Sequence, residues 1–218
     1  MPVNKEAYEQ LIADLGSHHV TLVAVSKTKS IEEIKELYDL GQRDFGENYV
    51  KELTEKQSQL PKDIHWHFIG HLQSNKVKQI APFIHLIQSV DSFKLLQEIE
   101  KQAKKNNRFI DCLLQIHIAE EETKFGLDET ALKQVMANIS EPFLTNTRVI
   151  GLMGMASFTD DMDKVRIEFQ YLKRLFDKYV KLSVLSMGMS SDYPIAIEER
   201  STMVRIGSLI FGARMNTQ

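Results

Sequence analysis

The sequence predicts an α/β protein, a single (β/α)8 TIM-like barrel with an extra helix before its first strand. Short apolar runs alternate with amphipathic helical patterns from one end of the chain to the other. Repeated strand–helix units form parallel sheets with right-handed crossovers. Eight such units in 218 residues suit a compact barrel. We see no linker or low-complexity segment, so the prediction is one domain over residues 1–218.

The predicted strands are the apolar runs, which are too short for helices and are bounded by polar or turn residues. They lie at 22–25, 43–45, 65–69, 86–88, 112–116, 149–153, 184–186 and 204–206.

The predicted helices show apolar residues at three- and four-residue spacing. The extra helix lies at 2–13, and others lie at 30–37, 91–100, 128–136, 163–179 and 194–198. Ser30 followed by Glu33 forms a capping box, and Asp128 is a good N-cap residue.

A doubly wound open sheet is the alternative fold. Its usual mark is a glycine-rich turn after the first strand, where a dinucleotide binds. Here the first strand runs into Ser26, Lys27, Thr28 and Lys29, with no glycine. The barrel is therefore the favoured fold.

Composition limits the function classes. A net charge of −3 argues against a nucleic-acid binder. No apolar stretch is long enough to span a membrane, and the N-terminal segment lacks the apolar core of a signal peptide. Cys112 is the single cysteine and lies in an apolar run, which predicts a buried thiol and excludes an intramolecular disulfide. We therefore expect a cytoplasmic protein, and a monomer because no apolar surface stripe is evident.

Lys27 is the residue that most suggests chemistry. It follows the first buried strand, where an unpaired ammonium is costly unless it reaches solvent. Its simplest interpretation is a lysine that extends to solvent. The alternative is imine formation with an aldehyde, which needs a neutral amine.

The last two strand ends predict a phosphate site, because barrels often bind phosphate there. Ser190 and Ser191 precede the predicted helix at 194–198, and Gly207 and Ser208 follow the eighth strand. Ordinary caps and turns are the alternative interpretation. A reactive lysine and a phosphate site together suggest pyridoxal 5′-phosphate (PLP). Arg205 could then face the pyridine nitrogen and keep it unprotonated; the alternative is an ion pair with Glu198 or Glu199.

Two other motifs favour simpler interpretations. His65, His67 and His71 have metal-like spacing, but the set lacks nearby ligands apart from Asp63, so we favour core and loop histidines over zinc. No serine stands in a G-x-S-x-G turn, so a serine hydrolase is unsupported.

Six motifs, in order along the chain, resemble the hallmarks of the pyridoxal phosphate homeostasis proteins (the YggS/PROSC family). They begin at Ala24, Phe45, His67, Ser186, Val204 and Phe211: AVSKTK, FGENY, HFIGHLQSNK, SMGMS, VRIG and FG. The resemblance implies PLP fold type III, a barrel similar to the alanine racemase N-terminal domain.

The resemblance also implies the cofactor-binding residues. PLP is expected as an imine on Lys27, with Asn48 nearby. The phosphate contacts correspond to Ser190, Gly207 and Ser208, and Arg205 to the residue facing the pyridine nitrogen. We add Met187 from the SMGMS motif, because a methionine can pack on a ring face; lining of the barrel is the simpler interpretation of this residue. Three positions depart from the family pattern: Ser208 replaces a common threonine, His117 an asparagine and Gly154 a larger residue.

Two functions then compete: a PLP carrier that maintains PLP homeostasis, and a PLP-dependent amino-acid racemase. Related racemases take a second base, a tyrosine, from a separate β domain of the partner subunit. The chain ends at Gln218, so we expect no such domain here. The prediction is a PLP-binding homeostasis protein without robust catalysis, with apo-PLP enzymes as candidate recipients.

Overall fold

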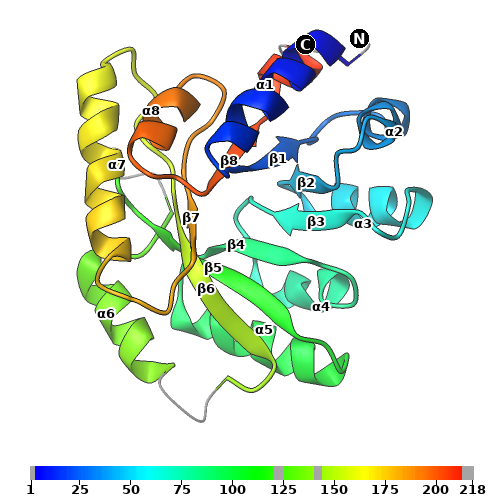
Figure 1. The fold of residues 1–218 in the computed structure, drawn as a ribbon. Helices are drawn as coiled ribbons and strands as arrows, with labels where there is room; N and C mark the ends of the chain where they lie inside the picture. Colours follow the sequence, from blue (N-terminus) through cyan, green and yellow to red (C-terminus); the bar gives the residue numbers. More distant parts are fainter. Residues whose placement is uncertain (1–2, 120–124, 140–143, 213–218) are drawn as a thin grey trace.

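The computed structural model describes residues 3–119, 125–139 and 144–212. Eight parallel strands close into a barrel in which each strand pairs with the next along the chain and β8 pairs with β1 (Figure 1). The strands are β1 (Thr21–Val25), β2 (Asp44–Glu47), β3 (His65–Phe68), β4 (Leu86–Val90), β5 (Ile110–Ile116), β6 (Thr147–Gly154), β7 (Val184–Ser186) and β8 (Met203–Ile206). The predicted barrel is confirmed.

Helices follow the strands and cover the outside of the barrel (Figure 1). They are α1 (Lys5–Ser17), α2 (Ile31–Asp39), α3 (Val50–Gln59), α4 (Val77–Ile80), α5 (Phe93–Lys105), α6 (Glu129–Asn138), α7 (Met162–Phe176), α8 (Tyr193–Glu198) and α9 (Ser208–Phe211), with a 3-10 turn η1 (Ser74–Lys76) before α4. None of the described helices is both long and apolar enough to cross a membrane.

The extra helix α1 lies beside the last helix, α9 (Figure 1). The backbone N–H of Asn4 donates to the carbonyl of Ile210 at 2.9 Å. Tyr8, Leu11 and Leu15 of α1 are buried, which anchors this helix to the barrel. Because α9 starts immediately after β8, α1 supports the segment that carries Gly207 and Ser208.

The core has two parts of different character. The larger part lies between strands and helices, and it includes Cys112, which is fully buried as expected. Burial raises the pKa of the Cys112 thiol. The smaller part lies inside the barrel and contains Val23, Leu86, Leu113, Met153 and Met203. Barrel interiors are usually filled by bulky apolar side chains.

The interior of this barrel also holds buried polar side chains from several strands. They are His67 of β3, Gln88 of β4, Ser186 of β7 and Arg205 of β8. Buried polar groups are costly unless they are hydrogen-bonded, so their partners need an explanation.

Candidate functional site

A cavity of about 430 Å³ lies at the carboxyl ends of the barrel strands. Residues that follow separate strands line it: Val25, Lys27, Thr28, Lys29, Asn48, Ile69, Met155, Phe158, Met189, Ser190, Ser191, Arg205, Gly207, Ser208 and Gly212. Six of the seven predicted site residues are in this set. Met187 is the one that is not.

Lys27 reaches the cavity from the turn after β1. It lies two residues beyond the end of the strand and is half-buried. The next residue, Thr28, has a left-handed backbone with φ of 66°, which turns the chain sharply towards α2. The ammonium of Lys29 donates to the carbonyl of Phe211 at 2.9 Å and so joins this turn to α9.

A buried ion pair supports the turn from the helix side. Glu47 is fully buried, and its Oε1 lies 2.7 Å from the Nζ of Lys56. The Lys56 ammonium also donates to the carbonyl of Ser26 at 2.7 Å, and the Ser26 hydroxyl donates to Glu47 at 2.7 Å. Burial raises the pKa of Glu47, although the Lys56 ammonium opposes this effect. These contacts fix the backbone immediately before Lys27.

Asn48 supplies an unused hydrogen-bond acceptor at the cavity. Its Oδ1 atom is buried and has no hydrogen-bond partner among the described residues. A buried amide oxygen without a partner costs free energy, so a ligand that donates a hydrogen bond there would be stabilised.

The loop after β7 and the turn after β8 bring polar groups to one side of the cavity. Ser190, Ser191 and Ser208 contribute hydroxyls. Gly207 also lines the cavity, and its backbone packs closely against β1: a Cβ added there would lie 3.1 Å from the carbonyl oxygen of Val25. The Asp192 carboxylate accepts from the backbone N–H of Met189 at 2.5 Å and closes the β7 loop.

Arg205 brings a buried cation to the bottom of the cavity. Its guanidinium donates to the Ser186 hydroxyl at 2.5 Å and to the carbonyl of Gly154 at 2.9 Å. Burial lowers the pKa of Arg205 to about 10, so the group remains charged at neutral pH. The alternative ion pair with Glu198 or Glu199 does not form, since both carboxylates pair with Arg166 instead.

Met187 lies in the core and not at the cavity. Ser186 points into the barrel towards Gln88, so the neighbouring Met187 side chain packs on the opposite side of the chain, where it is fully buried. Met155 and Met189 line the cavity instead, together with Phe158, which is 90% exposed. No sequence pattern indicated Phe158, because it lies beyond the last apolar residue of β6.

Gly154, the departure from the family pattern at the end of β6, lies against the ends of two apolar side chains. A Cβ there would lie 2.8 Å from a methyl carbon of Leu172 in α7 and 2.9 Å from one of Ile118. Its carbonyl also holds Arg205, so the small residue keeps the strand end close to the site.

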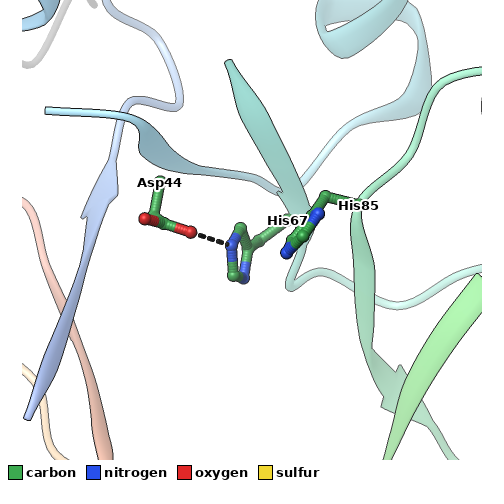
Figure 2. Close-up of side chains that lie close together, drawn as sticks. All are labelled: Asp44, His67 and His85. Carbon is green, nitrogen blue, oxygen red and sulfur yellow. Dashed lines mark hydrogen bonds and ion pairs between the residues drawn. The ribbon is translucent and has the colours of Figure 1, made fainter. Parts of the chain in front are cut away.

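Of the three histidines with metal-like spacing, His71 separates from the other two, whereas His65 and His67 both contact Asp44. His71 lies beyond β3, where it stacks on Phe125 and pairs with Asp91. His67 lies near the amino end of the barrel with Asp44 and His85, as Figure 2 shows. One potential ligand atom from each of these three residues lies within 4.8 Å of the others.

Neither Asp44 nor His85 was predicted at this cluster, because both lie far from His67 along the chain. Asp44 begins β2, and His85 immediately precedes β4. Although burial acts to raise the pKa of Asp44, the hydrogen bond and charge of His67 lower it overall. Burial and the neighbouring imidazoles lower the pKa of His85.

Comparison with known proteins places the chain in a family. Residues 3–215 match the model of the alanine racemase N-terminal domain. A pyridoxal phosphate homeostasis protein of Aquifex aeolicus is 41% identical over 208 residues, covering 93% of this chain and 90% of the relative. The chain belongs to the pyridoxal phosphate homeostasis protein family.

Solved structures agree with membership of this family. PipY of Synechococcus elongatus PCC7942, solved with PLP bound, has a TM-score of 0.84 and 33% identity; the match covers 94% of this chain and 100% of that one. Alanine racemase of Clostridium difficile 630 has a TM-score of 0.75 at 16% identity, with 60% of that chain covered, and it shares the fold. The predicted family and fold are confirmed.

Proposed function

We propose that the protein binds PLP in the cavity, with the cofactor joined as an imine to Lys27, and that it serves PLP homeostasis without robust catalysis. The observation that carries this proposal is the meeting of six predicted residues in one cavity: Lys27, Asn48, Ser190, Arg205, Gly207 and Ser208. The PLP-bound structure of PipY supports it, because that relative shares the fold along nearly the whole chain.

The residues present suit the chemical groups of PLP. Lys27 provides the amine that condenses with the aldehyde, releasing one water. The hydroxyls of Ser190 and Ser208 and the backbone of Gly207, which carries no side chain, suit the phosphate. The unpaired Oδ1 of Asn48 can accept a hydrogen bond from the ligand. Arg205 can only donate, so it would leave the pyridine nitrogen unprotonated, and such a ring is a weaker electron sink.

An absorption spectrum before and after borohydride tests the covalent attachment. We expect an imine band that borohydride reduces, with the reduced cofactor on the Lys27 peptide by mass spectrometry. Lys27→Ala should lose the band, and Lys27→Arg, which keeps the charge, should lose it too. Lys62→Ala is the matched control, because Lys62 follows α3, donates to the carbonyl of Gln57 and does not line the cavity. A wild-type protein that stays colourless with added PLP would refute the proposal.

The cavity lining supports a carrier over a racemase. A racemase needs a second proton-transfer group facing the lysine. Apart from Lys27, Lys29 and Arg205, the described residues that line the cavity carry no titratable side chain. We expect no solvent-deuterium incorporation at Cα of common amino acids at rates typical of enzymes. Lys27-dependent incorporation at such rates would favour the racemase.

The remaining parts of the proposal concern partners and location. We propose that apo-PLP enzymes receive the cofactor, that the protein is a monomer, and that it works in the cytoplasm, which suits its single buried thiol. Transfer to an apo-enzyme can be followed by recovery of that enzyme's activity, and light scattering gives the mass in solution.

A further inference from the structure

A chain of hydrogen bonds crosses the barrel interior from the cavity to the amino end. Arg205 Nη1 lies 2.5 Å from the Ser186 hydroxyl, which lies 2.7 Å from Oε1 of Gln88. Nε2 of Gln88 lies 2.9 Å from Nδ1 of His67, and Nε2 of His67 lies 2.9 Å from the Asp44 carboxylate. The last contact is drawn in Figure 2.

The middle of this chain is closed to solvent. Ser186 and Gln88 are 0% exposed and His67 is 1% exposed, whereas Asp44 is partly exposed at the barrel end. Each residue comes from a different strand of the closed barrel. Three buried polar side chains would be expensive there if any of them lacked a partner.

The chemistry of the two ends gives the chain a single direction. Arg205 can only donate, so the Ser186 oxygen accepts a hydrogen bond from it. The Ser186 hydroxyl in turn donates its single hydrogen to the side-chain carbonyl oxygen of Gln88. Gln88 presents its carbonyl oxygen to Ser186 and its NH₂ group to His67. The sulfur of Met203, which can only accept, lies 3.3 Å from the same Gln88 nitrogen and supports that orientation.

This direction determines the proton position on His67. Nδ1 accepts from Gln88, so in the neutral ring Nε2 carries the proton and donates it to Asp44. The other titratable groups around the ring are His65, which pairs with Asp44, His85, which packs against the ring, and Asp111, which acts on His85.

A metal ion is the competing explanation for the cluster in Figure 2. An ion shared with Asp44 would need a lone pair on Nε2 of His67, and the chain places a proton on that nitrogen. The hydrogen bonds account for Asp44 and His67, and ring contacts with His65 and His67 account for His85.

We propose that Ser186, Gln88 and His67 are positioning residues for the cofactor cavity. Their hydrogen bonds all run in one direction and hold the Arg205 guanidinium in place. The position of Arg205 therefore depends on which nitrogen of His67, at the opposite end of the barrel, carries the proton. The proposal rests on PLP binding in the cavity. A proton on Nδ1 of His67 would force the Gln88 amide to turn. Its NH₂ group would then face the Ser186 hydroxyl, which would lose the acceptor for its proton and would have to accept from both Gln88 and Arg205.

Gln88→Glu is the sharpest probe, since it keeps the shape and replaces the NH₂ group that donates to His67 by a carboxylate oxygen. A carboxylate beside Nδ1 can only accept, so Gln88→Glu should carry a proton on Nδ1 of His67. Nitrogen-15 NMR of the cofactor-free protein shows which ring nitrogens carry protons in the variant and in the wild type. In the wild type we expect the Nε2–H form.

The cofactor-loaded protein gives the second readout. Ser186→Ala removes the hydroxyl that accepts from the charged Arg205, and Gln88→Glu places a negative charge next to that hydroxyl, so each should weaken PLP binding by about tenfold. Both should also shift the absorption band. Ser186→Thr, which keeps the hydroxyl, should restore both properties. Gln115→Glu is the matched control. Gln115 is also a buried glutamine of a barrel strand, but it donates to the carbonyl of Phe125 and takes no part in the hydrogen bonds between Arg205 and Asp44.

The outcomes separate this proposal from the proposed function. If Nδ1 of His67 carries the proton in the cofactor-free wild type, the proposed direction of the hydrogen bonds is wrong, whether or not PLP binds. PLP binding that is unchanged in Gln88→Glu and Ser186→Ala refutes the positioning role and leaves the function standing. If the wild type never binds PLP, the proposed function is wrong. NMR of the cofactor-free protein still determines the direction of the hydrogen bonds in that case. If Gln88→Glu fails to fold, the Ser186→Ala and Ser186→Thr pair provides the same comparison.

Discussion

Single residues in the loop after β7 determine how Arg205 and the serine hydroxyls are held. Gly188 has a φ of 98°, a conformation that favours glycine, and its carbonyl accepts from the backbone N–H of Arg205 at 3.0 Å. A Cβ at Gly188 would lie 2.6 Å from the Cβ of Ala196 in α8. The loop therefore has neither the conformational freedom nor the space for a side chain.

Gly188→Ala should lower the free energy of unfolding by about 1–3 kcal/mol and weaken PLP binding, because the backbone must move beside Arg205. Gly16→Ala is the matched control. Gly16 lies in α1, where an added Cβ would have no other atom within 4 Å, so alanine there should stabilise the protein by about 0.5–1 kcal/mol. Urea unfolding measures both, and equal effects of the two changes would contradict this account.

Residues at strand ends could be predicted from the sequence, whereas residues inside the barrel could not. Lys27, Ser190 and Ser208 follow apolar runs, and the ends of parallel strands meet at one face. Ser186 and Met187 are neighbours, and only the strand register decides which one points inward. Gln88 was part of a predicted strand, but its partner His67 could not be inferred without that register.

At the scale of elements, helix starts were easier to predict than helix ends. Ser30 and Glu33 form the predicted capping box, and Asp128 accepts from the N–H of Ala131 at 2.7 Å. The helix predicted at 163–179 ends at Phe176. The apolar pattern continues because Tyr179 also packs on the core, although it lies in the turn that follows.

Helix α5 is joined to the segment before β6 by one buried carboxylate. Glu100 accepts from the backbone N–H groups of Thr145 and Asn146 at 3.0 and 3.1 Å and pairs with Lys104. Burial acts to raise the pKa of Glu100, but these donors outweigh it and lower the pKa to about 2. The folded state therefore prefers the ionised form more strongly than the unfolded state does.

This preference predicts a loss of stability in acid. The contribution of Glu100 is complete above the unfolded pKa of about 4.5 and disappears as the pH falls towards 2. We expect about 2–3 kcal/mol of the acid-dependent loss to be absent in Glu100→Gln, which should also be less stable at pH 7. Urea unfolding at several pH values measures both effects.

Glu129→Gln is the control for that experiment. The pKa of Glu129 is also lowered to about 2, by hydrogen bonds from Lys178 and Lys133, but this carboxylate is exposed and its ion pairs are screened by solvent. Its pH profile should follow the wild type. A Glu100→Gln profile that also follows the wild type would show that the buried contacts contribute nothing.

At the scale of the whole molecule, the closed barrel makes each strand depend on two neighbours. We infer that residues 1–218 form a single cooperative domain, since β8 closes on β1 and α1 packs on α9. Trp66, the single tryptophan, is 2% exposed and reports on the β2–β3 side of the core.

Without cofactor, Trp66 fluorescence and far-ultraviolet circular dichroism should therefore show the same urea midpoint. Fluorescence follows the environment of one buried ring, whereas circular dichroism follows all helices. Two separated transitions would indicate that part of the barrel unfolds independently and would contradict the single-domain inference.

The buried position of Cys112 makes the protein convenient for fluorescent labelling. The sequence has no other cysteine, and burial keeps this thiol inaccessible and protonated. A cysteine introduced at Val180, which is 96% exposed after α7, would be the only thiol that a maleimide dye could reach in the folded state. One dye at a known position, with a second dye on an enzyme that lacks its cofactor, would let single-molecule energy transfer test whether the two proteins meet as proposed.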